Sequence, residues 1–561
     1  MAMTNNDNQW WKKAAIYQIY PKSFCDSGGK GTGDIQGIIS KLDYLDKLGV
    51  DALWLTPIYE SPMVDNGYDI ADYYQVNPDF GTMADFDELL SKAHQRGIRI
   101  IMDIVVNHTS TEHVWFQSAL GDKQSPYRDY YIWKDPVNGG APNNWQSKFG
   151  GNAWALDEKT GQYYLHLFAK EQADLNWENP KVRDEVKKVI SFWAEKGVDG
   201  FRLDVINLIS KQQDFASDDM GDGRRFYTDG PKVHDYLQEI SEAVFQKYGS
   251  VTVGEMSSTT LEHCQQYSSL DGRELSMVFN FHHLKVDYPN GEKWTKAPFD
   301  FLQLKQIFNH WQTGLNGKGW GALFWCNHDQ PRVVSRLGND QQYRVESAKM
   351  LATSVHMMQG TPYIYQGEEI GMTNPGYTEL SQYRDLESTN MYRIMVDEQG
   401  VTHDDMMAIL AQKSRDNSRT PMQWDDQAHA GFTTGEPWLS VADNYHDINA
   451  KSALAEPHSV FYFYQRLIAL RKEVEVITTG DYLDLYPQHS AIFGYQRRSE
   501  TQTLVCLNNY YDQPVSCELP NQLPLDQADY ILGNYSLDEM KAVEHQQNLR
   551  PYETRVILIH H

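Results

Sequence analysis

Acidic side chains stand at the ends of short apolar segments, where they could take part in chemistry. Asp204 ends GFRLD with Arg202 two positions before it, Glu255 ends VTVGE, and Asp329 follows His328 in the segment NHDQP. Hydrolysis of a glycosidic bond needs one carboxylate to attack the anomeric carbon and one protonated carboxyl to protonate the departing oxygen. A third carboxylate can hold substrate hydroxyls in the distorted transition state. Arg202 would keep Asp204 ionised.

These segments belong to a pattern that repeats along the first two thirds of the chain. An amphipathic helix ends at a glycine, a short apolar strand follows, and polar residues stand at the end of that strand. The predicted strands are residues 16–20, 50–57, 98–108, 198–204, 251–255, 275–279, 322–325 and 362–365. Helices are predicted over residues 38–48, 85–96 and 182–196. Eight such units predict an α/β fold of the (β/α)8 TIM-barrel class, in which the strand ends share one face.

Two segments depart from this pattern and predict further domains. Residues 109–173 show no helix and strand alternation and are too long for an ordinary loop, so we expect an inserted domain after the third strand. Residues 480–561 contain short alternating runs with turn signals, which predict a C-terminal all-β sandwich domain. The barrel itself is then expected over residues 1–108 and 174–479.

Composition narrows the classes of partner and location. The 561 residues carry a formal net charge of −26, which disfavours nucleic acid and anionic membranes as partners. Neither a signal peptide nor a run of about 20 apolar residues is evident. Five scattered cysteines, an odd number, favour reduced thiols and a cytoplasmic location. No cofactor motif is evident, and the oligomeric state stays open.

The short segments match a known family in type, order and spacing. DIVVNH, GFRLDVIN, VGE and NHDQP resemble the four short regions of the α-amylase-type glycoside hydrolase family. QADLN, at residues 172–176, is similar to a fifth region that marks the oligo-1,6-glucosidase group, with Ala173 in place of a proline. The resemblance extends over essentially the whole chain. It implies a retaining enzyme with Asp204 as nucleophile, Glu255 as acid/base and Asp329 as stabiliser of the transition state.

The same resemblance implies a closed pocket for one terminal glucose. It places His108 and His328 on that sugar. The segment NGYD supplies Tyr68 to stack on the sugar and Asp69 to hold a distant hydroxyl. The motif SRDNSRTPMQW supplies Arg415, which is expected to pair with Asp69.

A calcium loop found in many relatives is altered here. Residues 26–34 keep the glycines of the turn, but Gly28 offers no side chain and Lys30 places a cation where a carboxylate would bind. We therefore expect no metal ion in this loop.

The stretch FNFHHLKVDYPNGEKW, residues 279–294, is expected to bind the leaving-group sugar of the substrate. It brings His282, His283, Lys285 and Lys293 into one loop on the catalytic face of an acidic protein. Lysine binds phosphate as a point charge. This stretch and GDGRRFYTDGP resemble the members of the family that hydrolyse trehalose-6-phosphate, so a small sugar phosphate is the expected substrate.

Two other interpretations remain open. An oligo-1,6-glucosidase acting on isomaltose-type oligosaccharides would use the same acids and leave Lys285 and Lys293 without a role, and Val205 after the nucleophile is compatible with it. A non-catalytic ancillary protein is the remote alternative, and the presence of all three acids argues against it.

Overall fold

The computed structural model describes residues 7–536 and 542–561. A parallel sheet of eight strands forms its centre, with the order β13-β12-β11-β5-β2-β1-β15-β14. A parallel bridge between Val278 and Gly321 joins the two ends of this order, so the sheet closes into a barrel. The strands are β1 (Ile16–Ile19), β2 (Ala52–Leu55), β5 (Arg99–Ile104), β11 (Gly200–Leu203), β12 (Val251–Glu255), β13 (Met277–Phe279), β14 (Ala322–Leu323) and β15 (Thr361–Tyr365). All eight lie within or beside the predicted segments, and the (β/α)8 class is confirmed.

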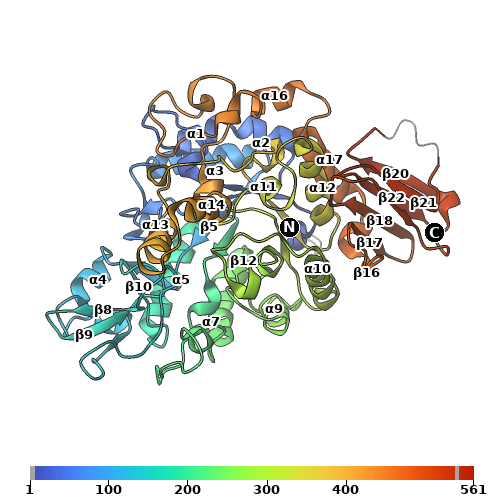
Figure 1. Ribbon diagram of the computed structural model, residues 1–561. Helices are drawn as coiled ribbons and strands as arrows, with labels where there is room; N and C mark the ends of the chain where they lie inside the picture. Colours follow the sequence, from blue (N-terminus) through green and yellow to red (C-terminus); the bar gives the residue numbers. More distant parts are fainter. Residues whose placement is uncertain (1–6, 537–541) are drawn as a thin grey trace.

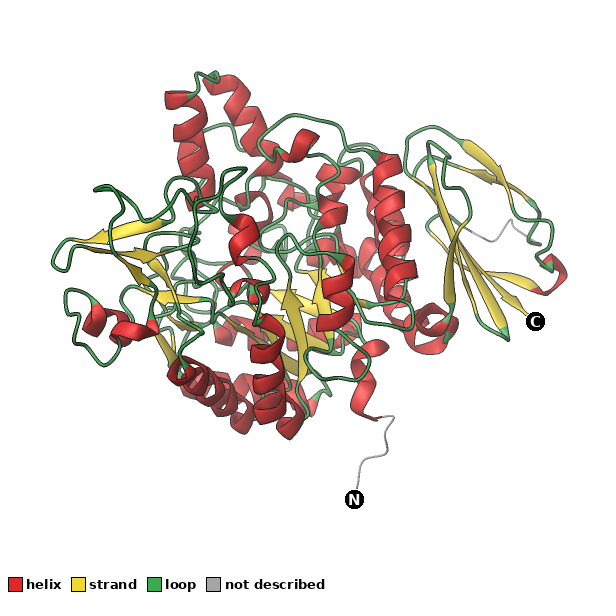
Figure 2. Ribbon diagram, turned by 90° about the horizontal axis from the view of Figure 1, so that it is seen from below, coloured by secondary structure: helices red, strands yellow, loops and turns green. Residues whose placement is uncertain are grey.

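Helices surround the barrel in both views (Figures 1 and 2). The principal ones are α1 (Ile35–Ser40), α2 (Leu42–Leu48), α3 (Met83–Gln95), α5 (Pro180–Lys196), α7 (Val233–Ile240), α9 (Leu261–Tyr267), α10 (Phe301–Leu315), α12 (Arg344–His356) and α17 (Val460–Glu473). The single helix predicted over residues 38–48 is instead two helices that meet at Lys41. Gly49 and Gly197 take the left-handed conformation that ends α2 and α5.

The insert leaves and re-enters the barrel at one place. Strand β6 (His108–Ser110) pairs antiparallel with β10 (Gln172–Asp174), which ties its two ends together above β5. Between them lie α4 (Val114–Ala119) and a three-stranded sheet of β7 (Trp133–Lys134), β9 (Gln162–Leu165) and β8 (Trp154–Asp157). This pairing brings His108 and Gln172 to the same edge of the barrel.

The C-terminal part is built only from β strands and one short 3-10 turn in its described residues. The strands β16 (Asp481–Asp484), β17 (Ile492–Arg498), β18 (Gln502–Asn509), β22 (Thr554–His560) and β20 (Ala528–Gly533) form one antiparallel sheet. Strands β19 (Val515–Glu518) and β21 (Gln546–Leu549) form a second. This β region and the insert lie at opposite sides of the barrel (Figure 1). We propose residues 109–173 and 480–561 as the limits of these two domains.

A further segment, residues 374–414, rises after β15 and folds over the face where the strands end. It contains α13 (Leu386–Tyr392) and α14 (His403–Lys413) and has its own apolar cluster around Met406 and Leu410. Asn390 Nδ2 donates to the carbonyl of Phe149 at 3.4 Å, so this segment contacts the insert above the barrel.

Candidate active site

One buried guanidinium holds three carboxylates at the ends of neighbouring strands. Arg202 Nη1 lies 2.9 Å from Asp103 Oδ1 and 2.5 Å from Asp204 Oδ1. Arg202 Nη2 lies 2.6 Å from Glu255 Oε2. The side chain of Arg202 is only 1% exposed, so these contacts are made away from bulk water, where they are strong. The sequence-based pairing of Arg202 with Asp204 is therefore present, and it extends to Glu255.

The hydrogen bonds leave one oxygen free on each of two acids. Glu255 Oε2 also accepts the backbone N–H of Val205 at 3.1 Å. Within the described residues no protein group bonds to Glu255 Oε1 or to Asp204 Oδ2. Because Glu255 Oε2 already accepts two N–H donors, a proton on this carboxyl belongs on Oε1. The site thus offers one unoccupied oxygen for attack and one for proton transfer.

Electrostatic coupling favours a cluster that keeps a proton. Burial raises the pKa of Asp204 well above its usual value, Arg202 opposes this, and the neighbouring charges of Glu255 and Asp103 raise it further. Burial likewise raises the pKa of Asp103 to about 6 against the opposing effect of Arg202. Three carboxylates around one guanidinium repel one another, so the form in which one of them is protonated is favoured. The raised pKa of Asp204 runs against the expectation that Arg202 alone keeps this carboxyl ionised, and attack by Asp204 requires that the shared proton reside on Glu255.

Asp329, in contrast, is held ionised. Burial alone would raise its pKa, but His328, Arg415 and Arg419 together lower it well below the usual range. Arg419 Nη2 lies 2.8 Å and Arg415 Nη1 lies 3.2 Å from Asp329 Oδ1. Burial lowers the pKa of His328 to about 3, so at neutral pH its ring is uncharged and contacts Asp329 as a neutral donor, while Arg415 and Arg419 supply the positive charge. Gln18 Nε2 donates to His328 Nδ1 at 2.8 Å, so the proton of the neutral ring lies on His328 Nε2. This Nε2 is 3.2 Å from Asp329 Oδ2.

The predicted pair of Asp69 with Arg415 is not formed, and Asp65 takes that position. Arg415 Nη2 lies 3.1 Å from Asp65 Oδ1 and 2.5 Å from Asp385 Oδ1. The oxygens of Asp69 instead accept the backbone N–H groups of Val64 and Asp65, at 2.8 and 3.0 Å. Asp69 is therefore buried and stabilises the turn that carries Asp65. The prediction that Asp69 pairs with Arg415 and binds substrate was wrong.

The closed end of the pocket brings other predicted residues together. Tyr68 stacks on His328 with ring centroids 5.1 Å apart and donates to Asp103 Oδ2 at 2.9 Å. His108 lines the same pocket, and burial lowers its pKa to about 4, so its ring is neutral. Phe149, Phe168 and Gln172 complete the lining. The two phenylalanines come from the insert and carried no distinguishing sequence signal, whereas Gln172 opens the QADLN segment.

Of the four side chains predicted to hold phosphate, only Lys285 is exposed and without an ion pair among the described residues, although burial of part of its side chain and the charge of Arg224 lower its pKa. His283 is buried against Phe324, and its Nε2 lies 2.8 Å from the carbonyl of Phe324. The prediction that His283 binds phosphate was therefore wrong. His282 packs on Trp311, and burial lowers its pKa to about 4, which leaves it uncharged. Lys293 Nζ is paired with Glu387 at 2.6 Å, so its charge is already compensated.

Two other cations gather on the side of Glu255. Lys148 Nζ donates to Ser257 Oγ at 3.1 Å, two residues beyond Glu255. The pKa of Lys148 is lowered to about 7, chiefly by burial and then by the charge of Arg224; Lys285 also lowers it, whereas Asp222 and Glu255 raise it. We call Lys148 and the two cations whose charges act on it, Arg224 and Lys285, the cationic group; Arg224 Nη2 is itself paired with Asp222 Oδ2 at 2.9 Å. Lys148 was missed because it lies in the insert, far from the others in sequence, whereas GDGRRFYTDGP contained Arg224.

The loop of residues 26–34 uses its acidic oxygens internally. Asp26 accepts the N–H groups of Gly28 and Gly29 at 2.9 Å each and that of Gly31 at 2.7 Å. Asp34 accepts the N–H of Gly37 at 2.6 Å. These donors compete with a cation for the same lone pairs. The expected absence of a metal ion stays a prediction.

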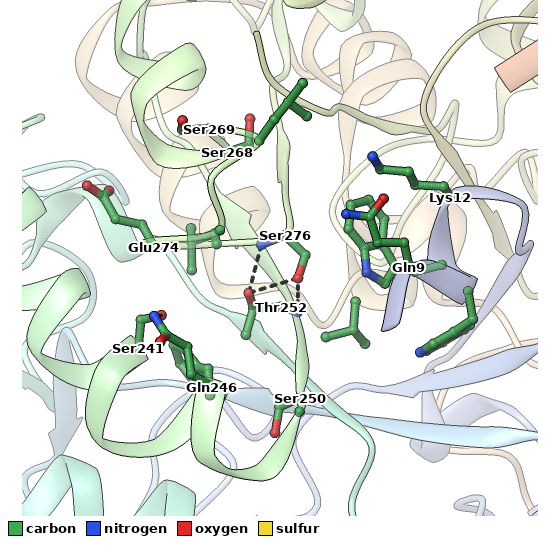
Figure 3. A pocket seen from close by; sticks show the side chains of 18 residues that line it. Gln9, Lys12, Ser241, Gln246, Ser250, Thr252, Ser268, Ser269, Glu274 and Ser276 are labelled. Atoms are coloured by element: carbon green, nitrogen blue, oxygen red, sulfur yellow. Dashed lines mark hydrogen bonds between the residues drawn. The ribbon is translucent and has the colours of Figure 1, made fainter. Parts of the chain in front are cut away.

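A second cavity lies near the opposite ends of the strands (Figure 3). Ser250 and Thr252 line it at the start of β12, whereas Glu255 ends that strand. Thr252 and Ser276 exchange hydrogen bonds with each other, and Glu274 accepts from Gln238 at 2.9 Å. The carboxylate cluster therefore remains the candidate for chemistry.

The chain is similar to known proteins over nearly its full length. A family model described as the alpha amylase catalytic domain matches residues 18–480. Trehalose-6-phosphate hydrolase of Bacillus subtilis (strain 168) is 59% identical, over 99% of this chain and 99% of that protein. Oligo-1,6-glucosidase of Parageobacillus thermoglucosidasius is 50% identical, over 98% and 99%. The crystal structure of Bacillus licheniformis trehalose-6-phosphate hydrolase shares the fold with a TM-score of 0.94 and 56% identity, over 98% and 100% of the two chains.

Proposed function

Because this chain belongs to the alpha-amylase family of glycoside hydrolases, we propose that it is a retaining α-glucosidase that hydrolyses trehalose-6-phosphate to glucose and glucose-6-phosphate. The relatives with 59% and 58% identity bear the name trehalose-6-phosphate hydrolase. All three predicted acids stand around one pocket, which argues against a non-catalytic role.

In the first step Asp204 Oδ2 attacks the anomeric carbon of the terminal glucose. The bond to the bridging oxygen breaks, and Glu255 transfers its Oε1 proton to that oxygen, so glucose-6-phosphate leaves. In the second step Glu255 takes a proton from water, whose oxygen attacks the glucosyl carbon and frees Asp204. Two inversions return the α anomer. Ionised Asp329 holds substrate hydroxyls and favours the distorted transition state.

The pocket supports removal of a single terminal glucose. Asp65, Arg415 and Tyr68 lie at its closed end, beyond the two reacting acids. Asp65 Oδ2 also accepts from Gln172 Nε2 at 3.1 Å, which fixes the carboxylate toward the pocket. A carboxylate and a guanidinium together can grip neighbouring sugar hydroxyls.

The cationic group of Lys148, Arg224 and Lys285 is the observation that carries the choice of substrate. Glu255 must protonate the departing oxygen, so it marks the side where the leaving sugar binds. Lys148 contacts Ser257 on that side at 3.1 Å, and the charges of Arg224 and Lys285 act on Lys148, in a protein whose net charge is −26. A dianionic phosphate on the leaving sugar would therefore be attracted by these local positive charges, although the net negative charge of the protein repels it at longer range.

An isomaltose-type substrate is the second candidate, because oligo-1,6-glucosidases match the chain at 50% identity over nearly its full length. Such a neutral substrate would leave the cationic group without a role. The two candidates therefore differ in whether removing a cation changes catalysis.

The test measures initial rates on trehalose-6-phosphate, trehalose, isomaltose and an aryl α-glucoside, with Arg224→Gln as the variant. Loss of a hydrogen bond to a charged group should lower kcat/KM for trehalose-6-phosphate by about 1.5–3 kcal/mol, or roughly 10- to 150-fold. Cleavage of the uncharged aryl glucoside should barely change. Arg225→Gln is the matched control, because Arg225 is the adjacent arginine and pairs with the buried Asp218 at 2.9 Å, whereas the partner of Arg224 at 2.9 Å is the partly exposed Asp222.

Two results would contradict the substrate proposal. Equal losses on charged and uncharged substrates would show that Arg224 is structural. A wild-type preference for isomaltose over trehalose-6-phosphate at low salt would favour the oligo-1,6-glucosidase alternative.

A cytoplasmic location is part of the proposal. All five cysteines lie in the described part of the chain, buried and unpaired, as is common for proteins of reducing compartments. In the described residues no helix is both long and apolar enough to cross a membrane.

A further inference from the structure

The backbone directly after Asp204 adopts a strained conformation. Val205 has φ 36° and ψ 39°, in the left-handed region that a β-branched residue rarely enters. Such strain persists only where surrounding contacts enforce it, and it concentrates at functional sites. Here the turn directs the N–H of Val205 to Glu255 Oε2 at 3.1 Å.

Asn207 makes a second link between the same two segments. Its Oδ1 accepts the backbone N–H of Ser257 at 2.9 Å, and its Nδ2 donates to the Ser257 carbonyl at 2.9 Å. The side chain is fully buried. One amide therefore binds both backbone groups of the residue two positions after Glu255.

The outer side of Asn207 is anchored as well. Its Nδ2 lies 3.1 Å from Asp229 Oδ1, which also accepts the hydroxyl of Tyr267 at 2.6 Å. Tyr267 lies on α9, outside the barrel strands. The amide is thus held in one orientation, in which its oxygen accepts an N–H and its nitrogen donates to oxygens.

We propose that Asn207 is a positioning residue that sets the reach of Glu255 toward the departing oxygen. This inference rests on the proposed acid role of Glu255. Asp204 is held without the Asn207 amide, by Arg202, which it shares with Glu255, and by its own N–H, which donates to the Ile104 carbonyl at 2.9 Å. Loss of the Asn207 amide therefore releases the segment after Glu255 while the attacking carboxylate keeps its contacts. Small misplacements of a reacting group lower rates strongly.

The test compares uncharged aryl α-glucosides that differ only in their leaving group, so that the cationic group has no part. A phenyl leaving group needs protonation, whereas 2,4-dinitrophenolate departs without it. Asn207→Ala should lower kcat/KM about 10- to 100-fold for the phenyl glucoside, which is part of the rate enhancement that a general acid supplies. For the dinitrophenyl glucoside, kcat/KM should fall by less than about 5-fold. Tyr267→Phe, which loosens the anchor, should show the same contrast in weaker form.

Two further variants separate the possible explanations. Asn508→Ala is the matched control for stability, because buried Asn508 donates to the Phe493 carbonyl at 3.0 Å and accepts from Thr554 at 2.8 Å in the C-terminal sheet. It should lower Tm without dependence on the leaving group. Glu255→Gln tests the acid itself and should show the strongest contrast between the two substrates.

Each outcome decides one point. Equal losses on both glucosides in Asn207→Ala, with a clear contrast in Glu255→Gln, would overturn the positioning role. No contrast in Glu255→Gln would overturn the acid assignment and the proposed mechanism instead. If Asn207→Ala does not fold, Tyr267→Phe decides in its place, because a uniform loss there overturns the proposal and a leaving-group contrast supports it.

Discussion

Replacing Asp65 by Asn tests the closed end of the pocket most directly. The substitution keeps the shape of the side chain and removes its charge. Asp65 Oδ1 accepts from Arg415 Nη2, and Oδ2 accepts from Gln172 Nε2, each at 3.1 Å. An amide has only one acceptor oxygen, so its nitrogen must face one of these two donors. One charge-assisted hydrogen bond is lost in a buried place.

The size of the effect follows from that loss. A hydrogen bond to a charged group contributes about 1.5–3 kcal/mol, which corresponds to roughly 10- to 150-fold in kcat/KM. Because the closed end binds the terminal glucose, the loss should be similar for trehalose-6-phosphate, isomaltose and an aryl α-glucoside. Arg415 keeps Asp385 at 2.5 Å, so the fold should survive.

Asp69→Asn is the comparison variant, assayed on the same three substrates together with Tm. The Asp69 carboxylate accepts the backbone N–H groups of Val64 and Asp65 and also bonds to the side chain of Ser61. We expect a lower Tm and a smaller loss of kcat/KM than for Asp65→Asn. A larger loss of kcat/KM for Asp69→Asn, or a loss for Asp65→Asn confined to one substrate, would refute this assignment of the pocket.

Three further predictions follow from the site and the core. The glucose released should initially be the α anomer in proton NMR spectra, and Asp204→Asn should remove most of kcat with the fold intact; β-glucose would contradict the roles of Asp204 and Glu255. Removal of metal ions by a chelator should leave activity unchanged, because the oxygens of Asp26 already accept three N–H groups. A rise in Tm on adding calcium would contradict the expected absence of a metal ion in the loop of residues 26–34. Burial raises the pKa of Glu368 to about 8, so the folded state keeps a proton that the unfolded state releases above about pH 4.3. Stability should therefore fall by up to about 1.4 kcal/mol per pH unit as pH rises from there to 8, and Glu368→Gln should remove this slope from Tm measured against pH.

The barrel and its acids follow from local signals in the sequence. Short apolar strands, helices ended by glycine and polar residues at strand ends are properties of short segments. Parallel strands in a closed barrel bring these ends to one face. The strand positions of Asp204 and Glu255 were predictable for this reason, and so was the closeness of Arg202 to Asp204.

The direction of side chains in turns and loops was decided only by the tertiary structure. Asp65 and Asp69 are four residues apart in one turn, and only contact with Arg415, 350 positions away, distinguishes them. His283 turns into the core while Lys285 stays exposed, although both belong to one basic stretch.

The cationic group shows the same limit. Its members come from the insert, the segment after β11 and the segment after β13, and no local pattern connects them. Propensity, capping and periodicity depend on neighbours within a few residues, so the sequence alone determined the elements and the strand ends. Ion pairing and burial depend on groups that only the closed barrel brings together, so the folded chain decided that Lys293 is paired with Glu387 while Lys285 stays exposed.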